Sequence, residues 1–203
     1  MSMLVGGVAG AILWLASAPL MSRFVARRRR SVAVWSTIVT VLSALACRTW
    51  GLSWIGAAAV VLVVGFVVLA EIDIGCRRLP REISYPLAVV ALVLVALSAV
   101  SEGETQPLLD ALAGVLVSTS SMFVLYAMSR GGLGDGDVRL APALGTAAAF
   151  GGIGTLWVTM LVAFVAAGVF VVMGLVLGRM NRSSAIPFGP FLIGGSLVAM
   201  LIS

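Results

Sequence analysis

Residues 53 to 74 read SWIGAAAVVLVVGFVVLAEIDI, an almost unbroken apolar run that ends in two acids, Glu71 and Asp73. A helix needs roughly 20 apolar residues to cross the hydrocarbon core of a bilayer, and this run has that length. Comparable apolar stretches recur along the chain, at 3–22, 31–48, 53–72, 84–101, 106–129, 138–150, 153–178 and 187–203. The pattern predicts an all-α, polytopic transmembrane helix bundle of about eight spans, forming one membrane domain over residues 1–203. Seven spans is the alternative, because only Gly151-Gly152 interrupts the apolar sequence between 138 and 178.

The composition agrees with a membrane protein and narrows the chemistry. Of the 203 residues, 61% are hydrophobic and 10% are charged, with a mean hydropathy of +1.17. A soluble domain has about half apolar residues and about a quarter charged ones, so lipid is the predicted solvent. The chain has no His and no Lys, which excludes Ser–His, Cys–His and Ser–Lys nucleophile pairs and the H-E-x-x-H zinc site. Carboxylates are the main acid–base groups that remain.

The arginines predict how the chain lies in the membrane. Twelve of the thirteen fall on alternate loops, at Arg23, Arg27 to Arg30, Arg77, Arg78, Arg81, Arg130, Arg139, Arg179 and Arg182. The other loops carry only Arg48, together with Glu102, Glu104 and Asp110. Arg-rich loops remain in the cytoplasm, so the N-terminus is predicted to lie outside. Since its basic residues follow the apolar run, the first span is expected to stay as an anchor. Membrane lipids, and not nucleic acid, are the partners that this charge pattern predicts.

Small residues have simpler interpretations. Cys47 and Cys76 are not spaced as a C-x-x-C pair, and two thiols alone cannot form a four-ligand zinc site. They are expected at opposite faces of the membrane, which argues against a disulfide between them. Small-xxx-small spacings such as Gly6 and Gly10 predict close helix packing.

Four acids lie at a depth where a membrane protein normally avoids them. Glu71 and Asp73 end the third span, and Asp135 and Asp137 follow the fifth span in the glycine-rich segment 130–137. Acids at membrane depth face a bundle interior, a partner or a wet cavity. The neighbouring glycines are expected to allow positive φ and a close approach to another helix. An acid–base dyad is one interpretation. Helix caps, ion pairs with nearby arginines, and a proton or cation pathway are the others.

Three blocks of sequence resemble the type IV prepilin peptidases, part of the GxGD group of membrane aspartyl proteases. DIGCRRLPREISYP at 73–86 resembles that family's Asp, six residues, Pro pattern, and GDGDVRLA at 134–141 resembles its GxGD block. IPFGPFL at 186–192 is similar to the stretch that begins its last span. The blocks occur in order and on the same predicted side of the membrane, over about residue 53 to the C-terminus. The signal peptide peptidase and presenilin group also has a GxGD aspartate, but its other blocks do not match.

The resemblance implies roles for particular residues. Asp73 and Asp137 become the catalytic pair, Asp135 an electrostatic neighbour, and Glu71 a tuning or capping residue. Gly134 and Gly136 are expected to shape the turn that holds Asp137, and Pro80 to set the loop after Asp73. The block at 186–192 is interpreted as the start of the last helix, or alternatively as the lining of a substrate groove. Bifunctional members carry a Cys-containing insert after the first span, but segment 22–31 is mostly Arg and has no Cys. The chain therefore resembles a short form without methyltransferase activity.

The resemblance also implies an activity. Two close carboxylates in a poorly solvated site share one proton, so one acts as the base and the other as the acid on a bound water. No metal or cofactor is expected. The implied substrates are type IV prepilins or pseudopilins, whose short leader ends in Gly and is cut at the cytoplasmic face of the prokaryotic inner membrane. The rival hypothesis is a transporter or non-enzymatic membrane subunit that uses the same acids for protons or cations.

Overall fold

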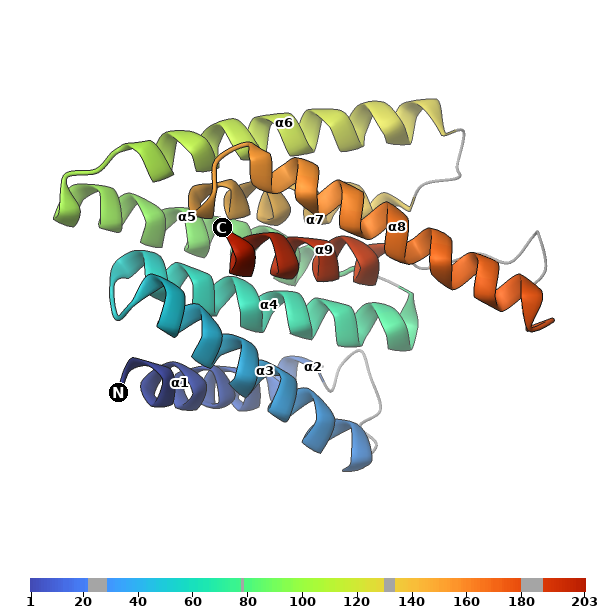
Figure 1. Ribbon diagram of the computed structural model, residues 1–203, viewed down its shortest axis with the longest axis horizontal. Helices are drawn as coiled ribbons and strands as arrows, with labels where there is room; N and C mark the ends of the chain where they lie inside the picture. The colour runs from blue at the N-terminus through green and yellow to red at the C-terminus, as the bar shows by residue number, and fades with distance from the viewer. Residues whose placement is uncertain (22–28, 78, 130–133, 180–187) are drawn as a thin grey trace.

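The computed structural model describes residues 1–21, 29–77, 79–129, 134–179 and 188–203, and every element in these ranges is a helix (Figure 1). The elements are α1 (Ser2–Ala16), α2 (Ala18–Met21), α3 (Arg29–Trp50), α4 (Trp54–Cys76), α5 (Arg81–Glu102), α6 (Gln106–Met128), α7 (Asp135–Thr146), the 3-10 helix η1 (Ala147–Phe150), α8 (Gly154–Val176) and α9 (Gly189–Ile202). The predicted all-helical, polytopic architecture is confirmed, and each of the eight predicted apolar stretches contains helix.

The helices differ in how far they can reach across a bilayer. Five within the described ranges are long and apolar enough to span one, namely α3, α4, α5, α6 and α8, while α1 and α9 are shorter apolar helices. The 12-residue α7 is about 18 Å long at 1.5 Å per residue, well short of the roughly 30 Å hydrocarbon core. The chain does break at Gly151-Gly152, where Gly152 takes a φ of +69° before α8 begins. The split between 138–150 and 153–178 is therefore confirmed, with the first part a short helix followed by a 3-10 turn.

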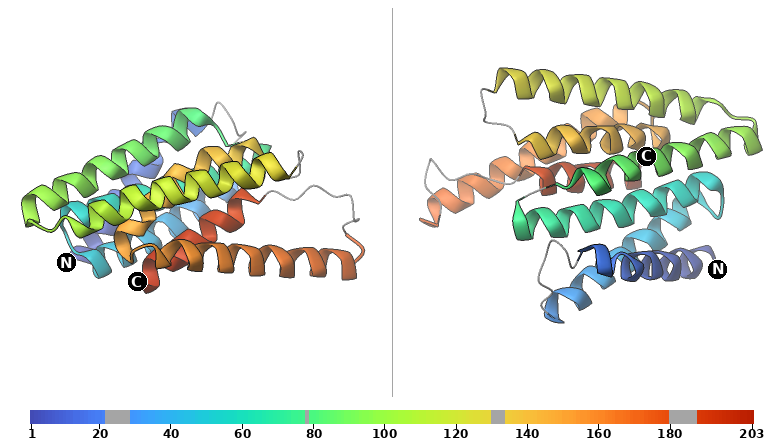
Figure 2. Two further views of the ribbon diagram at one scale, coloured as in Figure 1. Left: turned by 90° about the horizontal axis from the view of Figure 1, so that it is seen from above. Right: turned by 180° about the vertical axis from the view of Figure 1, so that it is seen from behind.

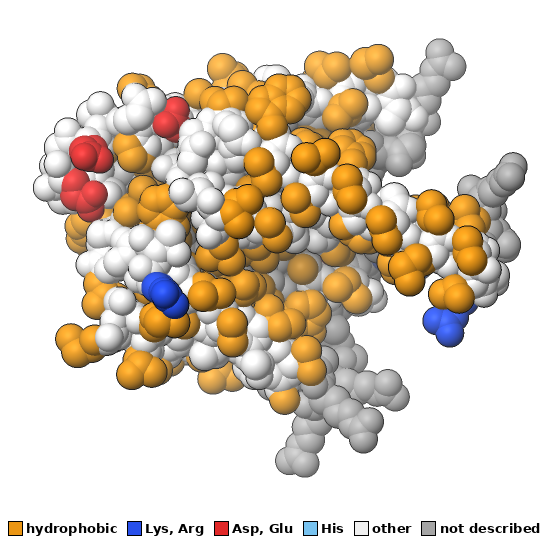
Figure 3. Space-filling view, in the orientation of Figure 1, with side chains coloured by type: hydrophobic (Ala, Val, Ile, Leu, Met, Phe, Trp, Pro, Cys, Tyr) orange, Lys and Arg blue, Asp and Glu red, His pale blue; other side chains and the backbone are white. Residues whose placement is uncertain are grey.

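Successive long helices run antiparallel, and this sorts their ends into two groups (Figures 1 and 2). The C-terminal ends of α4, α6 and α8 lie at the same end of the bundle as the N-terminal ends of α5, α7 and α9. The chain termini and the α5–α6 turn lie at the other end. Figure 3 shows apolar side chains over much of one face of the molecule, as expected for a surface that contacts lipid.

Helix α4 is the central helix of the bundle. Of the 18-residue apolar stretch in each helix, 78% is buried in α4 and only 11% in α8. Leu62, Phe66, Leu69 and Ile72 of α4 are fully buried, and α4 packs against α1, α3, α5 and α9. The element that carries Glu71 and Asp73 therefore contacts protein on most of its circumference.

Small residues allow several helices to approach closely. A Cβ atom on Gly6 would lie 2.4 Å from Sγ of Cys47, and one on Gly10 would lie 2.2 Å from Oγ of Ser43, so the predicted small-xxx-small packing joins α1 to α3. Cys47 is buried at one end of the bundle and Cys76 is exposed near the other, and no disulfide joins them, as predicted.

Helices α6 and α7 meet backbone to backbone. A Cβ atom on Gly145 would lie 2.5 Å from the carbonyl oxygen of Gly114. The Ser118 hydroxyl donates a buried 2.7 Å hydrogen bond to the Ala141 carbonyl. These contacts hold α7 against the longer α6 and so fix the position of the α7 N-terminus, where Asp137 lies.

Candidate active site

Asp73 lies in the last turn of α4. The Ser53 hydroxyl accepts a 3.2 Å hydrogen bond from the Gly56 N–H and caps the start of the helix. The helix ends where Arg77 takes a left-handed conformation, with φ of 52°, and its N–H donates to the Asp73 carbonyl at 2.7 Å. The Asp73 side chain is buried, with 5% of its surface exposed. Asp73 is therefore held at the end of the best-packed helix of the bundle.

Asp137 lies in the first turn of α7 and is also buried, at 6% exposure. Gly134 caps this helix with φ of −70° and ψ of 138°, and the Asp137 N–H donates to the Gly134 carbonyl at 3.1 Å. The glycines were expected to allow positive φ here, but neither Gly134 nor Gly136 takes it in the structure. The chain changes direction here because α7 begins, with Gly134 as its N-cap in an extended conformation. No residue with left-handed φ is needed.

Gly136 is needed for close packing. A Cβ atom built on it would lie 3.0 Å from Cβ of Leu79, which is tighter than ordinary van der Waals contact. The close approach predicted at this glycine is therefore found, but its partner is the loop between α4 and α5 and not another helix.

Gly189, the first residue of α9, lies against both carboxylates. A Cβ atom built on Gly189 would be 2.7 Å from Oδ2 of Asp73 and 3.4 Å from Oδ1 of Asp137. Because both distances start from the same Cβ position, Oδ2 of Asp73 and Oδ1 of Asp137 cannot be farther apart than the two distances added together. Three elements separated in sequence, the end of α4 and the starts of α7 and α9, converge at this point.

The two aspartates also interact electrostatically. Asp137 precedes the apolar part of α7 and lies outside the five long spans. Burial, followed by repulsion from the neighbouring Asp73 charge, raises the pKa of the Asp137 carboxyl to about 7, while a backbone hydrogen bond at Gly134 lowers it. The pair can therefore hold a proton at neutral pH.

Leu79 and Pro80 lie in the loop that joins α4 to α5, next to the two aspartates. Pro80 caps α5, and its carbonyl accepts from the backbone N–H groups of Ile83 and Ser84, both at 3.1 Å, and from the Ser84 hydroxyl at 3.2 Å. Leu79 is buried and packs against Gly136 and Gly189. The loop thus places an apolar side chain directly beside the carboxylate pair.

The other two acids have different surroundings. Asp135 is exposed and forms an ion pair with Arg139, one helical turn away. Glu71 is buried in α4 two residues before Asp73. The two ion pairs found among the described residues are Arg139–Asp135 and Arg81–Glu82, so the ion-pair alternative applies to Asp135 and not to Asp73 or Asp137.

The third sequence block is only partly described. Ile186 and Pro187 lie outside the described residues, and Phe188 to Leu192 form the N-cap and first turn of α9. This agrees with the predicted start of the last helix. The sequence did not single out Leu79 or Gly189 as site residues, although both belong to blocks that carried the resemblance. A glycine between two prolines at a helix start was the available signal for Gly189.

The fold and the site define a polytopic helical membrane protein with two buried aspartates held close together at a glycine. The profile of the type IV leader peptidase family matches residues 60–177, more than half of the chain. The chain belongs to this family, as its sequence blocks predicted.

Curated relatives agree with this assignment. A prepilin leader peptidase/N-methyltransferase of Stutzerimonas stutzeri is 31% identical over 169 residues, covering 79% of this chain and 55% of the relative. Proteins with the same name from Xanthomonas campestris and Aeromonas hydrophila are 27% and 32% identical, covering 88% and 81% of this chain and 64% and 56% of those proteins. The chain thus spans a little over half the length of the curated relatives it matches. No solved structure was found to match it.

Proposed function

We propose that this chain is an aspartyl endopeptidase that cuts the leader from type IV prepilin-like proteins, with Asp73 and Asp137 as its catalytic residues. The observation that carries the proposal is the placement of both carboxylates around Gly189. Membership of the type IV leader peptidase family and the printed names of the relatives support the substrate class.

The proposed mechanism uses the shared proton of the pair. One carboxylate is ionised and takes a proton from a bound water, whose oxygen attacks the scissile carbonyl carbon. The protonated carboxyl gives its proton to the carbonyl oxygen, forming a neutral tetrahedral diol. The ionised carboxylate then takes a proton from one diol hydroxyl as the C–N bond breaks, and the leaving nitrogen takes the proton of the other carboxyl, so the pair again holds one proton. No metal, cofactor or covalent intermediate takes part, and the two titrations belong to the pair.

The proposed activity is confined to cleavage. The printed names of the relatives include N-methyltransferase. Segment 22–31 of this chain has no cysteine, and residues 22–28 lie outside the described part. Cleavage is the chemistry that the carboxylate pair supports.

The experiment for this function is incubation of the purified protein with a panel of prepilin-like proteins, followed by mass spectrometry of the products. Cleavage at a single bond just before the hydrophobic N-terminal helix of at least one substrate is expected. The proposal would be overturned if no substrate were cut while the same preparation moved protons or cations across liposomes in an Asp73-dependent way.

We also propose that the carboxylate pair lies at the cytoplasmic side and the N-terminus outside. Twelve of the thirteen arginines fall on alternate loops of the sequence, and Arg77, Arg81 and Arg139 among the described residues lie at the helix ends that carry the pair. Arg81 at that end and Glu104 at the other are both exposed and suit labelling. In a Cys76→Ser background, Arg81→Cys should react with a membrane-impermeant maleimide only in inside-out vesicles. Glu104→Cys should react only in right-side-out vesicles, and the reverse pattern would refute this orientation.

A further inference from the structure

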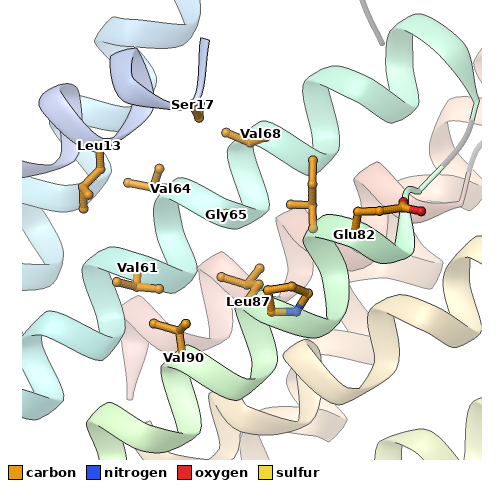
Figure 4. A pocket seen from close by; sticks show the side chains of 11 residues that line it. Leu13, Ser17, Val61, Val64, Gly65, Val68, Glu82, Leu87 and Val90 are labelled. Atoms are coloured by element: carbon orange, nitrogen blue, oxygen red, sulfur yellow. The ribbon is translucent and has the colours of Figure 1, made fainter. Parts of the chain in front are cut away.

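An apolar groove lies on the side of α4 between α1 and α5 (Figure 4). Its volume is about 280 Å³. Val61, Val64 and Val68 of α4 form the floor, at spacings that put them on one helix face. Leu13 of α1 and Leu87 and Val90 of α5 form the walls. Leu13 and Val90 are about half exposed, so the groove is open to the lipid side between α1 and α5.

The groove becomes polar at the end nearer the carboxylate pair. Glu82 lines it there, and the Glu82 carboxylate forms an ion pair with Arg81 at 3.3 Å. Pro86, another lining residue, has no N–H, so the Glu82 carbonyl lacks the helix donor that it would otherwise accept from. This end therefore offers two acceptor groups on Glu82 and a guanidinium on Arg81, side by side at the first turn of α5.

The dimensions of the groove suit a narrower occupant than a transmembrane helix. The polar end at Glu82 and the wall at Val90 are eight residues apart on α5, or about 12 Å along the helix axis. A helix with side chains is roughly 10–12 Å across, so it would cover the open side of the groove and not fill it. An extended hydrocarbon chain is narrow enough to fit.

The direction of the groove also separates it from the proposed peptidase site. Asp73 lies five residues after Val68, which rotates it by about 140° around α4. Asp73 packs towards Gly189 at the start of α9, whereas the groove faces α1 and α5. A substrate helix in the groove would therefore not present its cleavage site to the aspartates.

We propose that this groove binds one phospholipid with an amine headgroup, of the phosphatidylethanolamine class. An acyl chain lies along Val61, Val64, Val68 and Val90, and the headgroup sits at the first turn of α5. The Arg81 guanidinium contacts the phosphate, and the carboxylate and carbonyl of Glu82 accept from the ammonium. An anionic headgroup without an amine would meet the Glu82 carboxylate as a like charge, which explains the choice of lipid.

The test is native mass spectrometry of the delipidated protein titrated with phosphatidylethanolamine or phosphatidylglycerol of identical acyl chains. Wild type is expected to bind one phosphatidylethanolamine about tenfold more tightly than phosphatidylglycerol. Val90→Phe fills the groove and should weaken binding of both lipids about tenfold. Val89→Phe is the matched control, because Val89 is exposed on the same helix but does not line the groove, and it should bind as wild type.

Glu82→Gln separates headgroup recognition from groove filling. It should reduce the preference for the amine headgroup to about twofold or less while leaving phosphatidylglycerol binding unweakened. Equal affinities for the two lipids in wild type, or equal effects of Val90→Phe and Val89→Phe, would overturn the proposal. So would a photo-crosslinker at position 90 that captures a prepilin-like substrate and no phospholipid. These readouts do not depend on peptidase activity, so the proposed lipid site can be refuted without refuting the proposed peptidase activity, and the reverse.

Discussion

Asp137→Asn lowers the rate of prepilin cleavage by at least about 10³-fold while the protein still inserts and folds, and Asp73→Asn does the same. Asparagine has nearly the same size as aspartate, so the packing at Gly189 is kept. It can neither accept the proton of the attacking water nor hold the proton that the pair shares near neutral pH. The measurement is kcat/KM on a substrate that wild type cuts, with insertion checked by thermal unfolding in detergent.

Asp135→Asn is the matched control for this loss. It makes the same chemical change two residues from Asp137 on the same helix, but Asp135 is exposed and paired with Arg139. Its cleavage rate should stay within about threefold of wild type, because a surface ion pair contributes little. A similar loss in Asp135→Asn and Asp137→Asn would show that charge at the start of α7 matters and not the position of one carboxylate. Full activity in either Asp73→Asn or Asp137→Asn would remove that residue from the mechanism.

Hydropathy predicted most of this fold because the bilayer imposes length and polarity on every span. The run from 53 to 72 could only be a helix once lipid was the solvent, since each backbone polar group must be satisfied within its own segment. The same reasoning located the break at Gly151-Gly152. It also predicted a short segment at 138–150, but not that this segment would be divided into α7 and the 3-10 helix η1. Here the backbone contact between Gly114 and Gly145 places α7 beside a longer α6.

The family resemblance also paired Asp73 with Asp137 and made Asp135 an electrostatic neighbour. In the structure Asp135 is exposed while the other two are buried. What the sequence could not supply is the third element of the site. The approach of α9 to both carboxylates is a tertiary contact between residues more than 50 positions apart, and no local propensity encodes it. Gly134 does not use the positive φ that the sequence allowed, because a glycine permits that conformation without requiring it.

Gly189→Ala is expected to lower cleavage by roughly 10²-fold without preventing folding. The added Cβ would lie 2.7 Å from Oδ2 of Asp73 and 3.0 Å from Cδ1 of Leu79, so one of these side chains must move. Asp73 sits at the end of a well-packed helix, and its carboxylate is the group that can swing away. A displacement of about 1 Å at a reacting group costs on the order of 10²-fold in rate. The loss should appear in kcat more than in KM, because the displaced group is a reacting one.

Gly194→Ala distinguishes this steric effect from a general effect of alanine in α9. Both glycines lie in the same helix, but a Cβ atom on Gly194 would meet no atom of the described residues within 4 Å. Alanine is favoured over glycine in a helix interior by about 0.5–1 kcal/mol, so Gly194→Ala should keep wild-type activity and unfold at an equal or higher temperature. If Gly189→Ala cleaved as fast as Gly194→Ala, the close packing of α9 against Asp73 would have no bearing on the reaction. A loss confined to Gly189→Ala would instead place the start of α9 within the catalytic geometry.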